Sequence, residues 1–142
     1  MILNEIAFSF SSYDLIDITG KSLNKTIQAP EVIDYHGFLG NTIIGCLTVV
    51  IDKSKVGYFE MPNLRSSQDM ALWLLIMKRG FKAYGLNKIL ASYRIVPTSN
   101  TANKWKAAKN VWRVFRNIER INLIKSSYYF MCYAINALKK RL

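Results

Sequence analysis

The rest of the chain is arranged around the stretch Arg65-Ser66-Ser67-Gln68-Asp69-Met70-Ala71-Leu72-Trp73-Leu74-Leu75-Ile76-Met77-Lys78-Arg79-Gly80. This stretch predicts a helix. Ser66 or Ser67 can cap its N-terminus with a hydroxyl oxygen, and Ser66 with Asp69 fits a capping box. Gly80 predicts the end of the helix, because glycine readily adopts the backbone conformation that follows a last turn. The stretch therefore predicts one carboxylate, Asp69, in the first turn of an apolar helix.

The apolar residues of this stretch recur at helical spacing. Leu72, Leu75 and Ile76 fall on one face by the i, i+3, i+4 rule, and Trp73 with Met77 widens that face. We expect this face to pack on a sheet, with Trp73 in the core.

Strand patterns surround the predicted helix, so the expected fold class is α/β with a mixed sheet. Residues 5–13 alternate apolar and small polar side chains, as a strand with one buried face does. Residues 42–51 are apolar and largely β-branched, and they predict a buried central strand. Further short strands are predicted at 15–18, 81–84 and 89–95, a short helix at 32–39, and a turn or a single helical turn at 53–57.

Composition limits the class of protein. The chain has 142 residues, enough for one domain, and 51% of them are hydrophobic. No run of about 18 apolar residues is present, and residues 1–5 lack the basic segment of a signal peptide. The single histidine, His36, and the cysteines Cys46 and Cys132 are not spaced as metal ligands. A folded domain without a membrane-spanning helix is therefore expected, and no metal site.

Positive charge is concentrated at one end of the chain. Residues 101–142 carry ten Lys or Arg residues and one acid, Glu119, whereas residues 1–100 carry ten basic and eight acidic residues. Two helices are predicted here, at about 105–119 and 126–140, the first with its tryptophans on the packed face. Such a tail favours an anionic partner, either a membrane surface or nucleic acid. An interfacial helix and a helix packed on its neighbour with a solvated basic end both fit the second segment.

The helix stretch also resembles part of a known enzyme family. Gln68-Asp69-Met70-Ala71-Leu72-Trp73-Leu74, followed by a helix that ends at Gly80, is similar to the second half of family 2 glycosyltransferases, which are inverting enzymes of the GT-A fold. The resemblance implies that Asp69 is the general base that deprotonates the acceptor hydroxyl. A plain capping role for Asp69 is the alternative, and the two roles can coexist.

Other segments resemble the same family in the same order, at 8–13 with 17–21, 41–49, 90–95 and 99–104. The enzymes nearest in pattern build bacterial O-antigen, capsule or teichuronic-type polysaccharides. The resemblance implies further acceptor-side or phosphate-steering candidates, namely Asn41, Thr48, Arg65, Gln68 and Arg94. A solvated loop arginine remains the alternative for Arg65, and a cross-strand ion pair for Arg94.

The family's nucleotide-binding features do not occur in this sequence. Members hold a divalent cation, Mn²⁺ or Mg²⁺, on the donor diphosphate with an Asp-x-Asp motif, and the chain contains no such motif. Fewer residues precede the first predicted strand than the βαβ units of a nucleotide-binding half need. We therefore expect residues 1–100 to be the C-terminal, acceptor-side half of a GT-A domain and residues 101–142 to be a basic helical tail. The chain would be a truncated or split form, with the N-terminal half possible in trans.

The resemblance gives a functional hypothesis. It implies transfer of a hexose from a nucleotide sugar, expected to be a UDP-sugar, to a lipid-linked or saccharide acceptor in surface polysaccharide synthesis. The basic tail then predicts a cytoplasmic protein held at the inner face of the cytoplasmic membrane, on an anionic surface. The alternative is a non-catalytic basic module that binds a membrane surface or nucleic acid, of which nucleic acid is the less favoured partner.

Overall fold

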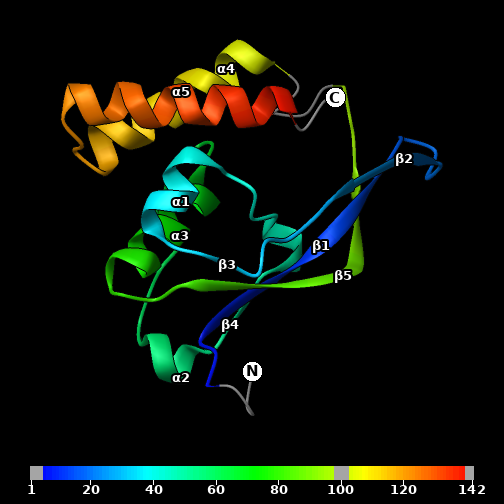
Figure 1. The fold of residues 1–142 in the computed structure, drawn as a ribbon, viewed down its shortest axis with the longest axis horizontal. Helices are drawn as coiled ribbons and strands as arrows, with labels where there is room; N and C mark the ends of the chain where they lie inside the picture. Colours follow the sequence, from blue (N-terminus) through cyan, green and yellow to red (C-terminus); the bar gives the residue numbers. More distant parts are fainter. Residues whose placement is uncertain (1–4, 98–102, 140–142) are drawn as a thin grey trace.

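The computed structural model describes residues 5–97 and 103–139 (Figure 1). Its centre is a five-stranded mixed sheet with the order β2-β1-β5-β3, and β4 also pairs with β1. The strands are β1 (Phe8–Ile16), β2 (Ser22–Ile27), β3 (Val32–Ile33), β4 (Val50–Ile51) and β5 (Ala83–Arg94). The predicted α/β class with a mixed sheet is confirmed.

The central pair of the sheet, β1 and β5, is parallel, and the other pairings are antiparallel. A parallel pair needs a long crossover connection, and here the crossover contains the first three helices. Gly85 lets β5 pass close to the loop before β3. A Cβ atom at this position would lie 2.0 Å from the Pro30 carbonyl oxygen, and Gly85 N donates a hydrogen bond to Glu31 O at 2.9 Å.

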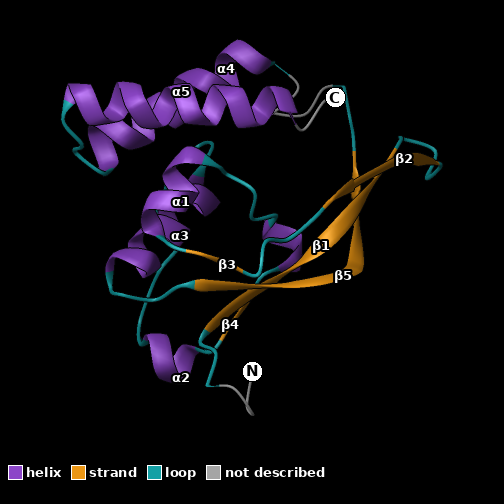
Figure 2. Ribbon diagram, viewed as in Figure 1, coloured by secondary structure: helices purple, strands orange, loops and turns teal. Residues whose placement is uncertain are grey.

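Helices α1, α3, α4 and α5 lie together on one side of the sheet, and α2 lies apart from them near β4, as Figure 2 shows. Helices α1 and α3 lie between the sheet and an outer pair formed by α4 and α5 (Figure 1). The helices are α1 (Tyr35–Gly40), α2 (Lys53–Val56), α3 (Gln68–Lys78), α4 (Lys104–Arg113) and α5 (Leu123–Lys139), with a 3₁₀ turn, η1 (Cys46–Thr48), and a π-helical turn, η2 (Val114–Ile118).

Helix α3 is the predicted central helix, and it is buried on more sides than its periodicity suggests. All its residues from Met70 to Met77 are buried except Leu75, which is 38% exposed. Trp73 packs on the sheet, with its ring centroid 5.3 Å from that of Phe8 in β1. The prediction that Leu75 shares the packed face is therefore wrong. A helix between two layers has no broad solvent face, so the i, i+3, i+4 pattern cannot single one out.

Two strand predictions are wrong. Residues 42–51 do not form a buried central strand, because they run as a loop, the η1 turn and the two-residue strand β4, with much of their surface intermediate or exposed. The close approach of Gly45 to the Tyr13 ring, where a Cβ would lie 2.6 Å from Cε1, keeps this segment beside the sheet. The two strands predicted at 81–84 and 89–95 are one continuous strand, β5, and β2 was not predicted.

The basic tail is anchored through its only acid. The Glu119 side chain is 3% exposed, lies 2.7 Å from Lys78 Nζ in α3, and accepts a hydrogen bond from the Tyr35 hydroxyl in α1 at 2.6 Å. Val111, Val114 and Phe115 of the tail itself are buried in the core. The prediction that Trp105 belongs to the packed face is wrong, because its side chain is 88% exposed. It lies on the first turn of α4, before the buried contacts begin.

Helix α5 packs on α1 with one face only. Asn136 Nδ2 donates to Gly40 O at 3.0 Å, and the Tyr129 hydroxyl is 2.6 Å from His36 Nδ1. The opposite face carries a row of exposed apolar side chains at alternating spacings of four and three residues. We call this row the α5 stripe, formed by Ile124, Tyr128, Met131, Ile135 and Leu138.

Candidate active site

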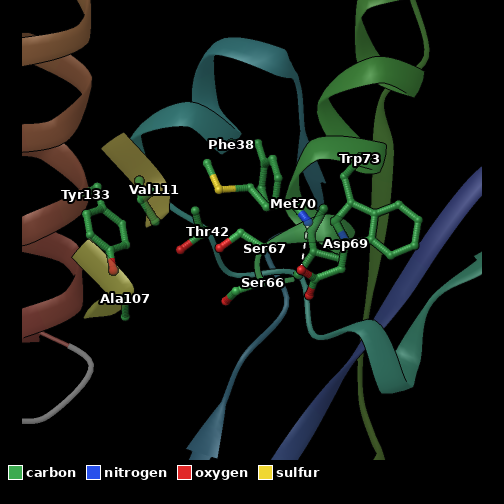
Figure 3. Close-up of a pocket in the computed structure, with 11 residues that line it drawn as sticks. Phe38, Thr42, Ser66, Ser67, Asp69, Met70, Trp73, Ala107, Val111 and Tyr133 are labelled. Atoms are coloured by element: carbon green, nitrogen blue, oxygen red, sulfur yellow. Dashed lines mark hydrogen bonds between the residues drawn. The ribbon is translucent and has the colours of Figure 1, made fainter. Parts of the chain in front are cut away.

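A cavity of about 190 Å³ lies in front of the N-terminus of α3, between the sheet side of the molecule and the outer helices (Figure 3). We call it the Asp69 cavity, because Asp69 is the only carboxylate among the described residues that line it. It is lined by Phe38, Thr42, Ile44, Ser66, Ser67, Asp69, Met70, Trp73, Ala107, Val111 and Tyr133. Segments far apart in the sequence, from α1 to α5, therefore meet at one carboxylate.

Asp69 is partly buried and held by its own helix. Its Oδ1 accepts a hydrogen bond from Met70 N at 2.9 Å, the contact drawn as a dashed line in Figure 3. No described residue donates to Oδ2. One oxygen thus fixes the orientation of the carboxylate, and the other can accept a proton from a bound hydroxyl group.

Two serine hydroxyls remain available beside Asp69. Ser67 is the N-cap of α3, but its backbone is left-handed (φ 60°) and its side chain makes no capping hydrogen bond. The predicted capping by serine and the Ser66–Asp69 capping box are therefore wrong, since Asp69 bonds to Met70 N instead. A left-handed backbone is uncommon outside glycine and costs about 1 kcal/mol or more. In Figure 3 the Ser66, Ser67 and Thr42 hydroxyls lie between Asp69 and Tyr133.

An unused hydrogen-bond donor and apolar side chains complete the lining. Trp73 is 3% exposed, and its Nε1 has no hydrogen-bond partner in the described part of the chain. A buried donor without a partner costs free energy, which a ligand oxygen can recover. Phe38, Ile44 and Val111 give the cavity apolar walls. Apolar walls with a few convergent polar groups are typical of small-molecule sites.

The η1 turn brings Cys46 near Asp69. Burial raises the pKa of the Cys46 thiol, and the negative charge of Asp69 raises it further. The 41–49 segment therefore lies near the carboxylate, and its acceptor-side role stays a prediction. The residues of that segment that line the Asp69 cavity are Thr42 and Ile44.

A second cavity of about 320 Å³ adjoins the first, and we call it the basic cavity. Ser66 lines both cavities. The basic cavity is otherwise lined by Leu64, Arg65, Lys106, Lys109, Asn110, Arg113, Val114 and Ile118. Among its described lining residues there are therefore four cationic side chains and no carboxylate.

The structure brings some of the predicted site residues together and separates others. Asp69 and Arg65 line the two adjacent cavities, and Gln68 is exposed at the start of α3. Asn41 instead caps the end of α1 through its backbone N–H. Thr48 Oγ1 donates to Gly45 O at 2.9 Å. Arg94 Nη1 donates hydrogen bonds to the carbonyl oxygens of Asp17 and Ile18, and these bonds hold the β1–β2 turn. Arg94 is not among the residues that line either cavity.

Sequence reasoning missed the contribution of the tail to the site. Lys106, Lys109 and Arg113 recur at spacings of three and four along α4, which places them on one helix face. The sequence shows that these three residues share a helix face, but it does not show that this face lines a cavity. Tyr133 of α5 was likewise missed.

The described residues do not provide a ligand set for a divalent cation. No group of three His, Cys, Asp or Glu side chains that could hold a metal ion occurs within residues 5–97 and 103–139. No helix in the same part of the chain is long and apolar enough to cross a membrane.

Comparison with known proteins finds glycosyltransferases. The chain is 51% identical, over 100% of its length, to TuaG of Bacillus subtilis (strain 168), which is named as a teichuronic acid biosynthesis glycosyltransferase. It is 33% identical over 99% of its length to two Escherichia coli enzymes, WfgD and WfaP, each named as a UDP-Glc:α-D-GlcNAc-diphosphoundecaprenol β-1,3-glucosyltransferase.

The chain spans about half the length of the curated relatives it matches, 56% of TuaG and 54% of each E. coli enzyme. No family model and no solved structure matches it. The predicted resemblance to glycosyltransferases of bacterial surface polysaccharides is confirmed.

Proposed function

We propose that this chain is the acceptor-side part of an inverting glycosyltransferase that transfers a hexose from a UDP-sugar to a lipid-linked or saccharide acceptor. The observation that carries the proposal is the Asp69 cavity, in which a single carboxylate with an unpartnered oxygen faces hydroxyl groups at the start of α3. The similarity to glycosyltransferases over the whole chain supports it.

Asp69 is the proposed general base. The acceptor hydroxyl binds within hydrogen-bond reach of Asp69 Oδ2 and gives it the proton as the acceptor oxygen attacks the anomeric carbon. The new glycosidic bond forms on the face opposite the leaving nucleoside diphosphate, so the configuration inverts as the old bond breaks. Thr42, Ser66 and Ser67 lie where they can orient the acceptor sugar, and Trp73 Nε1 offers a further donor.

The donor and any cation belong to the complete enzyme in this proposal. The described residues supply no cation ligand set, so the Mn²⁺ or Mg²⁺ that the family resemblance implies would be held by other residues. The relatives are nearly twice as long as the chain, which leaves room for a donor-binding half in the same protein or in a second chain.

The proposed location is the inner face of the cytoplasmic membrane, and the α5 stripe supports it. Five apolar side chains follow one face of the helix, and Ile124 among them is 83% exposed. Because Glu119 is buried against Lys78, the charges that the tail presents to solvent are basic. An apolar stripe beside basic side chains is typical of a helix that lies in the interface of an anionic membrane.

Replacing Asp69 by Asn in the complete enzyme tests the catalytic proposal. The amide keeps the shape of the carboxylate and an oxygen for Met70 N, but it cannot take the proton. We expect transfer to a lipid-linked saccharide to fall by about 10²- to 10⁴-fold with no change in the melting temperature.

Asp52→Asn is the matched control, since Asp52 also accepts from a backbone N–H at a helix start, in α2, and lies outside both cavities. Near-normal turnover in Asp69→Asn would reduce Asp69 to a structural residue.

A further inference from the structure

The basic cavity holds charge that the protein does not neutralise. Arg65 comes from the loop before α3, and Lys106, Lys109 and Arg113 come from α4. None of these four side chains makes an ion pair with a described residue. The nearby acid Glu119, which follows the η2 turn, pairs with Lys78 instead. Like charges around one cavity repel each other, so the arrangement costs stability unless an anion fills it.

Asn110 adds a neutral donor to the same cavity. Its Nδ2 is buried from solvent and has no hydrogen-bond partner among the described residues. An amide N–H₂ beside four cations offers hydrogen bonds to an acceptor-rich, negatively charged group. The lining therefore combines uncompensated positive charge with an unused donor.

We propose that the basic cavity binds the diphosphate group of a lipid-linked acceptor, an inference that rests on the proposed function. The two cavities share Ser66 in their linings, so a diphosphate in one would lie next to a sugar in the other. An acceptor of the type named for WfgD carries its sugar directly on a diphosphate. In such an acceptor the reacting hydroxyl and the diphosphate are attached to the same sugar ring. In the protein, Asp69 lines one cavity and the four cations line the other, with Ser66 between them.

The residue types in the basic cavity suit this ligand. The planar guanidinium groups of Arg65 and Arg113 can each bind two phosphate oxygens, and Lys106 and Lys109 act as compact point charges. No carboxylate in the lining repels the diphosphate. This proposal gives a reason for the position of α4, which places three of these cations beside the Asp69 cavity.

Calorimetry on the full 142-residue chain tests the proposal with three probes: a short-chain polyprenyl-diphosphate N-acetylglucosamine, inorganic pyrophosphate and UDP. The test variant is Lys106→Ala with Lys109→Ala. The matched control is Lys125→Ala with Lys139→Ala, two exposed lysines of α5 outside the cavity. Both variants lose the same net charge from exposed positions, and circular dichroism verifies that both fold.

We expect the polyprenyl-diphosphate sugar to bind the test variant about 10- to 100-fold more weakly than the control, because two charge-assisted contacts are lost. The binding of pyrophosphate and of UDP, which both carry a diphosphate, should weaken in the same direction by a smaller factor. Equal binding of the polyprenyl probe by both variants would overturn the proposal, as would a loss seen only with UDP or only with free pyrophosphate. Because this readout is binding without transfer, it stands or fails apart from the Asp69→Asn assay.

Discussion

Glu119 shows how one residue fixes the position of a whole segment. It is the only acid among residues 101–142, and its carboxylate is buried between Lys78 of α3 and Tyr35 of α1. The same contacts remove the one negative charge from the outer surface of the tail. A single buried carboxylate therefore both anchors the tail and leaves its surface basic.

Replacing Glu119 by Gln should destabilise the fold. The amide can still accept from Tyr35, but it loses the ion pair and turns an N–H₂ group toward Lys78. Lys78 is 45% exposed and can turn to solvent, so we expect a loss of about 1–3 kcal/mol in the free energy of unfolding, measured by urea denaturation. Glu60→Gln is the matched control, because Glu60 accepts from the Tyr58 hydroxyl on the exposed surface. Equal effects of the two substitutions would mean that Glu119 is no anchor.

Tyr35 gives this anchor a pH dependence. Burial raises the pKa of the Tyr35 hydroxyl strongly, and the hydrogen bond to Glu119 and its charge raise it further. The stabilisation is fully present below the unfolded pKa of about 10 and is lost as the pH rises toward the folded value. Above about pH 10, the free energy of unfolding should therefore fall less steeply with pH in Tyr35→Phe than in the unsubstituted protein.

Helix α5 uses its two faces for different purposes. One face carries Ser126, Tyr129 and Asn136 against the rest of the molecule, and the other carries the α5 stripe. The sequence allowed either an interfacial helix or a packed one. In the structure α5 packs on α1, which confirms the packed interpretation, and the exposed apolar row leaves the interfacial interpretation as a prediction.

The α5 stripe should hold the protein on anionic vesicles. We expect Met131→Ser with Ile135→Ser to lower the vesicle partition coefficient about tenfold or more, because each loses apolar area that the membrane would bury. High salt should also release protein, since each basic side chain near an anionic surface contributes about 1 kcal/mol that salt screens. Co-sedimentation with anionic and with neutral vesicles measures both effects.

Leu86→Ser with Leu90→Ser is the matched control, because both leucines are exposed on β5 and far along the chain from α5. Equal pelleting with neutral and anionic lipid, or equal loss in the two variants, would show that the stripe does not dock on a membrane. The cluster Lys139-Lys140-Arg141, which the sequence places next to the stripe, lies partly outside the described residues.

At the scale of the whole molecule, the structure combines the Asp69 cavity with a fold that has no cation site among its described residues. The Asp69 cavity and the basic cavity are both built from residues 5–97 and 103–139, and no carboxylate cluster in these ranges could hold a metal. The division into a half domain at 1–100 and a tail at 101–142 stays a prediction. The two parts nevertheless contact each other closely through Glu119, and together they line both cavities.

The 142-residue chain alone should show no metal-dependent binding of a UDP-sugar. The reason is that the donor diphosphate would have to be held with a cation for which the described residues offer no ligand set. Calorimetry with UDP-glucose, with and without Mn²⁺, is the measurement. The longer relative TuaG, 51% identical to the chain, is the comparison protein. Micromolar binding that appears only with Mn²⁺ would contradict this prediction.

Local sequence features predicted local structure well. The central helix, the single helical turn at 53–57, the first strand and the two tail helices all occur near the predicted positions. The errors arose where distant contacts override local preference. The apolar run at 42–51 predicted a strand, but its approach to Tyr13 and to the site holds it in irregular structure. The single strand β5 was predicted as two strands, and the gap between them contains Gly85, the point where another backbone passes close.

The sequence by itself determined the α/β class, the helix that carries Asp69 in its first turn and the concentration of positive charge after residue 100, because periodicity, composition and charge are properties of neighbouring residues. Only the tertiary structure decided which residues share a cavity with Asp69. Arg94 was separated from it by its contacts to the β1–β2 turn, while Lys106, Lys109 and Tyr133 were brought to the two cavities. The physical reason is that packing between segments far apart in the chain sets which side chains converge, and no local pattern encodes those distances.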